Sequence, residues 1–239
     1  MIVDTADLLV TPQVAAGRYE AGTTAVLLRI LRPGDLAVDL GANQGFHTLT
    51  MGVTVGPAGV VHAFEPHPRT FAYLVENVTS VGLPHVVTVH QAAAADREGT
   101  AAFRALEGQA AGSHLDIFED DWTAELPGDL VDVRTVDVAG FLRSLPRRPR
   151  LVKVDVEGAE LLLLEAMMPV LDPKVTSIVI EIIPPVIEQA GGIGRFLELI
   201  RGAGYRIWSV NGEGFDELDD ELLRAIDFAD VLLAVAPPC

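Results

Sequence analysis

The chain of 239 residues has one cysteine, Cys239, and no apolar run long enough to cross a bilayer. A single cysteine excludes an intramolecular disulfide and a zinc site built on several cysteines. The best apolar stretch, residues 175–187, is interrupted by Glu181 and two prolines, whereas a spanning helix needs about 20 apolar residues. Asp4 and Asp7 stand where a secretory signal is basic. We therefore expect a cytoplasmic protein without a membrane partner.

Basic residues are scarce. The 17 Lys and Arg against 34 Asp and Glu leave a formal charge of -17, and such a field repels phosphate polymers and anionic membranes. The one basic concentration, residues 143–150 with four arginines, is typical of a solvated loop. We expect a small-molecule acceptor and no nucleic acid as partner, and we leave a homodimer open.

Short apolar runs alternate with longer segments of helical period, which indicates βα units and an α/β fold. The expected strands are residues 36–40, 60–64, 86–90, 151–154, 177–183, 205–210 and 231–235. The expected helices are residues 46–53, 68–80, 159–168, 193–203 and 217–226. The last two strands lack the long helix of a parallel crossover, so this pair is expected to be antiparallel. The pattern predicts a mixed seven-stranded sheet flanked by helices.

The length fits a single domain, residues 1–239. Residues 1–32 are expected to form an N-terminal helical extension. Residues 99–135 break the alternation, because two strand candidates, residues 100–103 and 131–135, bracket a glycine-rich and then acidic segment. Long excursions of this kind are often lids or binding loops, so we expect a lid outside the main sheet.

Two neighbouring strand ends carry residues suited to a nucleoside. The first expected strand ends in a turn containing Gly41 and Gly45, and the second ends in Glu65. Ligands of parallel sheets bind beyond the carboxyl ends of the strands. Glycine lets the backbone approach a ligand closely, and a carboxylate accepts hydrogen bonds from both ribose hydroxyls. The sequence therefore predicts a nucleoside-containing ligand.

The turn does not fit a dinucleotide. A pyrophosphate loop has the pattern G-x-G-x-x-G, whereas Ala42 and Asn43 stand where the middle glycine would help. S-adenosylmethionine has no phosphate, and its ammonium group is compatible with Asp39 just before the turn. No Tyr-x-x-x-Lys pair of a nicotinamide enzyme occurs. Methyl transfer is favoured, with an NAD-dependent oxidoreductase as the alternative.

Three ordered stretches carry a more specific resemblance. VDLGANQGFHTL, VHAFEPHPRTFAYLVENV and VKVDVEGAELLLLEAM follow one another at residues 38, 61 and 152. The chain resembles the FkbM-type S-adenosylmethionine-dependent methyltransferases. The resemblance implies a class I methyltransferase fold, which is Rossmann-like. It also implies Gly41, Asn43 and Gly45 around the methionine moiety.

The same resemblance puts Glu65 on the ribose, Gln91 and Ala92 near the adenine, and Asp155 near the methyl donor. Asp39, Pro66 and His67 lie beside these positions in the sequence. The expected cofactor-binding residues are Asp39, Gly41, Asn43, Gly45, Glu65, Pro66, His67, Gln91, Ala92 and Asp155.

Methyl transfer is an in-line displacement, in which a base is needed only when the nucleophile must lose a proton. The expected catalytic residues are Asp155, Glu157, Glu181 and His114. Asp155 and Glu157 alternate at a strand end, so they point to opposite sides unless the turn redirects them. Glu181 lies within a strand, where an unpaired carboxylate is costly. His114 lies on the expected lid and could reach the acceptor.

Carboxylates at neighbouring strand ends can also hold Mg²⁺, but we expect no metal here. The predicted function is O-methylation of a hydroxyl of a natural product, which is a polyketide, a sugar or a peptide derivative. N-methylation on the same fold is the alternative. Glu65 and Asp155 argue against a non-catalytic binding protein.

Overall fold

The computed structural model describes residues 1–8, 10–107, 112–116, 127–210, 214–226 and 228–238. Cys239 lies outside the described residues, as does most of the glycine-rich and acidic segment of the expected lid. Within the described ranges, none of the helices combines the length and the apolar character that crossing a bilayer requires.

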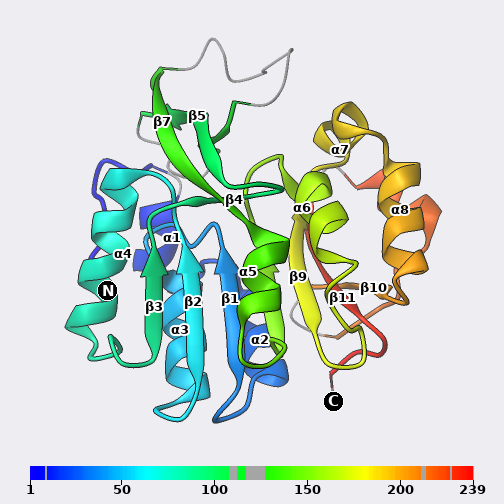
Figure 1. The fold of residues 1–239 in the computed structure, drawn as a ribbon, viewed down its shortest axis with the longest axis horizontal. Coiled ribbons are helices and arrows are strands. Elements are labelled where there is room, and N and C mark those ends of the chain that lie inside the picture. The colour runs from blue at the N-terminus through cyan, green and yellow to red at the C-terminus, as the bar shows by residue number, and fades with distance from the viewer. Residues whose placement is uncertain (9, 108–111, 117–126, 211–213, 227, 239) are drawn as a thin grey trace.

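A seven-stranded sheet forms the centre of the molecule (Figure 1). Its strand order is β10-β11-β9-β8-β1-β2-β3. Every neighbouring pair is parallel except the two pairs that β11 makes, with β9 and with β10, which are antiparallel. The strands are β1 (Leu36–Leu40), β2 (Val60–Phe64), β3 (Val87–His90), β8 (Leu151–Val154), β9 (Ser177–Ile182), β10 (Arg206–Ser209) and β11 (Ala229–Ala234). The predicted mixed α/β sheet and its antiparallel last pair are confirmed.

Helices cover both faces of this sheet and enclose two hydrophobic cores. One face packs against α2 (Ala21–Ile30), α3 (Phe46–Val55) and α4 (Pro68–Ser80). The other packs against α5 (Val138–Ser144), α6 (Glu160–Met167), α7 (Pro184–Ala190), α8 (Ile193–Gly202) and α9 (Asp220–Ala225). Parallel strands covered on both faces are buried and mostly apolar, and β1 and β8 are buried at every residue, including Asp39 and Lys153.

A second, smaller sheet lies above the carboxyl ends of the central strands (Figure 1). Its order is β4-β7-β5-β6, and its strands are β4 (Ala93–Ala95), β5 (Gly99–Leu106), β6 (His114–Leu115) and β7 (Gly128–Asp137). The strand candidates at residues 100–103 and 131–135 lie within β5 and β7, which are longer. A separate apolar cluster that includes Phe103, Leu115 and Val133 holds the strands together.

The N-terminal segment contributes α1 (Val10–Ala15) and α2. It is anchored near the first turn of the sheet, because Asn77 of α4 accepts a hydrogen bond from the backbone N–H of Ile2 and donates to the carbonyl oxygens of Ile2 and Gln44. The residues between α1 and α2 are thereby brought to the carboxyl edge of the sheet.

Candidate active site

A cavity of about 410 Å³ lies at the carboxyl edge of the central sheet. The end of β1, the end of β2 and the loop after β8 form one part of its wall, and residues of the smaller sheet, among them Phe103 and Leu115, form another. The predicted site residues that line it are Gly41, Asn43, Glu65, Pro66, His67, Ala92, Asp155, Glu157 and Glu181. Nine of the expected side chains or turns therefore share one cavity.

Four expected site residues lie elsewhere than on the cavity wall that the structure describes. Asp39 is fully buried within β1, where its carboxylate accepts a 2.5 Å hydrogen bond from the Thr48 hydroxyl of α3. Gly45 caps α3, and a Cβ there would lie 2.7 Å from Leu74. Asp39 contacts α3 through its carboxylate, and the backbone of Gly45 packs against Leu74 of α4. Both residues therefore connect helices to the sheet.

Gln91 and His114 are also placed away from the cavity. Gln91 is exposed just after β3, whereas the next residue, Ala92, is buried and lines the cavity. His114 is buried within the smaller sheet, and its Nδ1 lies 2.8 Å from the carbonyl oxygen of Gly112. For His114 the alternation of side chains along β6 accounts for this, since its neighbours Ser113 and Leu115 line the cavity.

Gly41 is required where β1 approaches β8. Its φ is +81°, and a Cβ there would lie 1.6 Å from the carbonyl oxygen of Asp155. A side chain is excluded by direct overlap with the backbone, in addition to the cost of the left-handed conformation. The glycine thereby allows the backbone that carries Asp155 to pack directly on the turn after β1.

Glu65 joins the turns that follow β1 and β2. Its Oε2 accepts a 3.0 Å hydrogen bond from the backbone N–H of Asn43, and its Oε1 accepts one of 2.9 Å from that of His67. Burial raises the pKa of Glu65 to about 7, although both hydrogen bonds act to lower it. The carboxylate is thus fixed in position at the cavity wall, and each of its oxygens retains a further lone pair.

Asp155 is paired with a lysine inside the sheet. Lys153 of β8 has an exposed side-chain fraction of 4%, and its Nζ donates a 2.6 Å hydrogen bond to Oδ2 of Asp155. Burial acts to lower the pKa of Lys153, but the charges of Asp155, Asp39 and Glu20 outweigh it, so the pKa lies above its usual range. The lysine therefore stays charged.

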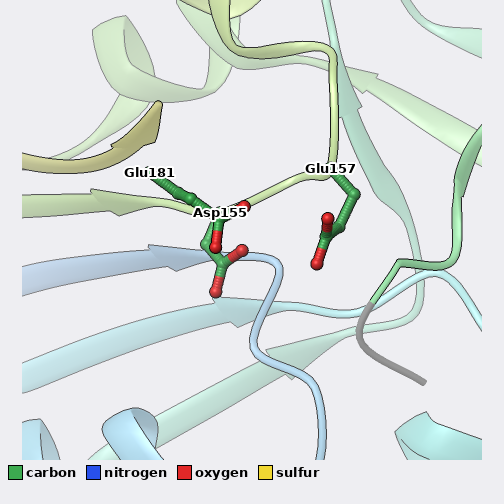
Figure 2. Close-up of side chains that lie close together, drawn as sticks. All are labelled: Asp155, Glu157 and Glu181. Carbon is green, nitrogen blue, oxygen red and sulfur yellow. The ribbon is translucent and has the colours of Figure 1, made fainter. Parts of the chain in front are cut away.

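Glu157 faces the cavity because the turn after β8 is left-handed at that residue. Its φ is +56°, which is unusual for a residue with a side chain, and its Oε1 accepts a 2.9 Å hydrogen bond from the backbone N–H of Gly112. Figure 2 shows the carboxyl groups of Asp155 and Glu157 on the same side of this loop. Burial and the negative charge of Asp155 raise the pKa of Glu157 to about 8.

Glu181 reaches the same place from β9, which neighbours β8 (Figure 2). Its exposed fraction is 9%, and within the described part of the chain its buried Oε2 has no hydrogen-bond partner. Burial, with the nearby charges of Asp155 and Glu157, raises the pKa of Glu181 to about 11. One oxygen from each of Asp155, Glu157 and Glu181, hereafter the acidic cluster, lies within 4.8 Å of the others.

Sequence reasoning missed two cavity-lining residues between α1 and α2, Tyr19 and Glu20. Glu20 is 2.7 Å from Nε2 of His47. Burial acts to raise the pKa of Glu20, but the hydrogen bond from His47 and the charge of Lys153 lower it to about 2. No local pattern marks these residues. Lys153, in contrast, stands in an apolar strand, and that isolated charge was a detectable signal.

The chain is similar to the hexuronic acid methyltransferase AglP of Haloferax volcanii, with 31% identity over 167 residues. The similar region covers 69% of this chain and 63% of that relative, so the chain spans less than two thirds of the relative's length.

Two solved structures share the fold at low sequence identity. The O-methyltransferase TomG from Streptomyces achromogenes, in complex with S-adenosylmethionine, is 14% identical with a TM-score of 0.53, over 98% of this chain and 92% of that one. Precorrin 8W decarboxylase from Methanobacterium thermoautotrophicum is 15% identical with a TM-score of 0.51, over 98% of this chain and 99% of that one. These likenesses confirm the predicted class I methyltransferase fold.

Residues 39–207 match the family described as the Methyltransferase FkbM domain. This region contains the end of β1, together with β2, the smaller sheet, β8 and β9, and it includes every predicted site residue. The chain belongs to the FkbM methyltransferase family.

Proposed function

We propose that this chain transfers a methyl group from S-adenosylmethionine to a hydroxyl of a small-molecule natural product, with a sugar as the favoured acceptor among sugars, polyketides and peptide derivatives. The observation that carries the proposal is the position of Glu65, which is fixed by Asn43 and His67 at the wall of the cavity that the acidic cluster also lines. Membership of the FkbM family supports the activity. The name of the relative AglP supports a sugar.

The residues present fit this cofactor. The cavity of about 410 Å³ lies within the range of small-molecule sites, roughly 300–1,000 Å³. The carboxylate of Glu65 has lone pairs that can accept hydrogen bonds from the two ribose hydroxyls. Ala92, Ala94 and Phe103 line the same cavity and offer apolar surface to a purine. The wall thus combines a polar anchor for the sugar with an apolar surface for the base.

S-adenosylmethionine supplies an activated methyl group on a sulfonium. The protein contributes alignment, which is worth roughly 7–11 kcal/mol, and proton removal, which is worth about 2.7–5.5 kcal/mol for a general base of 10²- to 10⁴-fold effect. Asp155 is the member of the acidic cluster whose ionised form the charge of Lys153 favours most, and it lines the cavity, so it is positioned to accept the hydroxyl proton of the acceptor. His114 is not among the described residues of the cavity wall, so the proposal relies on the acidic cluster for this role.

The acceptor class is tested by incubating the protein with a labelled methyl donor and four groups of acceptors: hexuronates, neutral glycosides, hydroxylated polyketides and amines. We expect label in a glycoside, with the new methyl on a hydroxyl oxygen by NMR. Label only in amines would replace O-methylation by N-methylation. Specific NAD(H) binding without S-adenosylmethionine binding would replace the proposal by the oxidoreductase alternative.

Glu65 should make cofactor binding depend on pH. Because the pKa of Glu65 is about 7 in the free protein and its ionised form is the better acceptor for ribose hydroxyls, affinity should rise with pH. The ionised fraction increases about tenfold between pH 6 and pH 8, and the apparent affinity follows it. Calorimetric titration with S-adenosylmethionine at both values measures the change. In Glu65→Gln we expect binding at least about tenfold weaker at pH 8 and without this pH dependence.

Glu160→Gln is a matched control. Glu160 is also buried, also accepts backbone hydrogen bonds, from Gly158 and Val156, and also has a pKa raised by burial to about 7. It is not among the described residues of the cavity wall, so its variant should keep the wild-type pH dependence. Equal flattening in both variants would count against Glu65 as the ribose ligand.

A further inference from the structure

We propose that the acidic cluster of Asp155, Glu157 and Glu181 binds one divalent cation that prefers oxygen ligands, such as Mg²⁺ or Ca²⁺. From the sequence we expected no metal here, and we expected Asp155 and Glu157 to point to opposite sides unless the turn redirects them. The left-handed turn at Glu157 brings both carboxylates to one side.

The spacing of the three carboxylates fits such an ion. One oxygen from each residue lies within 4.8 Å of the others. Two ligands on opposite sides of Ca²⁺ are about 4.6–5.2 Å apart, and those of Mg²⁺ about 4.0–4.2 Å apart. The three oxygens therefore lie no farther apart than two opposite ligands of one Ca²⁺ do, and a small closure of the side chains would bring all three into one coordination sphere. Two ligands follow β8 and one lies on β9, so neighbouring strands hold the cluster.

Glu181 provides a separate indication of a ligand. Its carboxylate is directed from β9 toward Asp155 (Figure 2), its exposed fraction is 9%, and its Oε2 has no hydrogen-bond partner among the described residues. The buried carboxylates of Glu65 and Glu160, in contrast, are held by backbone N–H groups. An unpaired buried carboxylate oxygen is costly, and a cation in the cluster would satisfy it.

The local charge matches a divalent ion. Lys153 compensates one of the three carboxylates through its 2.6 Å contact with Asp155. Two negative charges remain on the cluster when all three groups are ionised, and one divalent cation balances them. The competing explanation is that the three carboxyl groups share protons, which would reduce their negative charge without a cation.

The cluster provides three of the six to eight oxygen ligands that such ions take. Because the three carboxylates line the cavity, the remaining positions face the space for an acceptor. The role of the ion, though not its binding, rests on the proposed function: two neighbouring hydroxyls of a sugar-like acceptor would complete the coordination and be held in a fixed orientation beside the methyl donor.

The test is calorimetric titration of chelator-treated, dialysed protein with MgCl₂ and with CaCl₂, without cofactor or acceptor. We expect one saturable site for at least one of the ions. Glu181→Gln should weaken the affinity of this site for the ion by at least about 10- to 100-fold, since loss of a residue that only hydrogen-bonds to a metal ligand already weakens metal affinity by that factor. Glu98→Gln removes the same charge from an exposed position and should bind as the wild type does.

The melting temperature provides a second measurement. The ion should raise the melting temperature of the wild type by mass action and, at the same ion concentration, raise that of Glu181→Gln much less. Glu181→Gln should fold, because the carboxylate oxygen that it replaces has no hydrogen-bond partner among the described residues. Glu157→Gln is tested in parallel. Absence of saturable binding, or equal binding in wild type and both variants, would overturn the cation site. Separate titration with S-adenosylmethionine shows whether the proposed function stands in that case.

Discussion

Gly41→Ala is expected to abolish measurable S-adenosylmethionine binding and to destabilise the protein. The new methyl group would lie 1.6 Å from the carbonyl oxygen of Asp155, so the turn after β1 or the end of β8 must move. Overpacking costs about 1–3 kcal/mol, and the left-handed backbone adds about 1–2 kcal/mol. Urea denaturation should report a loss of roughly 2–5 kcal/mol in unfolding free energy, and calorimetry should report no cofactor binding.

Gly34→Ala isolates the effect of this contact. Gly34 has a similar φ, +90°, but a Cβ there would meet no atom within 4 Å. The control should lose only the left-handed cost, about 1–2 kcal/mol, and should bind the cofactor normally. If both variants lost the same stability and the same affinity, the close approach of β1 to Asp155 would have no special importance.

Lys153→Met is expected to lower the free energy of unfolding by about 3–5 kcal/mol, the usual cost of removing one partner from a buried ion pair. The change leaves Asp155 without its 2.6 Å partner and removes the positive charge that also acts on Asp39 and Glu20. Denaturation should be measured in buffer with a chelator, so that no cation substitutes for the missing charge.

The double variant Lys153→Met with Asp155→Asn separates charge from packing. Removing both charges should cost less than the sum of the single changes, and the difference measures the coupling of the pair. Arg206→Met, which breaks the exposed ion pair with Glu217, should leave stability close to that of the wild type. Additive losses in the double variant would mean that Lys153 acts through packing alone.

Much of the architecture was predictable because burial leaves a strong local pattern. Strands such as β1 and β8 are buried at every residue, so each reads as a short apolar run between turn residues. The antiparallel arrangement of β11 followed from the short connection before it. The smaller sheet was less predictable, since β5 and β7 are partly exposed along their length and their pairing brings together segments of different composition.

The site was predictable where a residue follows directly from a strand end. Glu65 and Asp155 come at the ends of β2 and β8, and the parallel arrangement brings those ends to one edge. Asp39 was also expected at the cavity, yet it lies within β1, where one residue of offset turns a side chain to the other face. Tyr19 and Glu20 had no signal, because they reach the cavity through the path of the N-terminal segment.

The amino-acid sequence by itself determined the α/β class, the strand positions, the family and the acidic residues at the sheet edge, since these depend on apolar periodicity and short motifs. Only the tertiary structure decided which side chains meet. The left-handed backbone at Glu157, the reach of Glu181 from β9 and the pairing of Lys153 with Asp155 are relations between atoms in space. Their energies depend on burial and on distance, and neither quantity is written in the order of the residues.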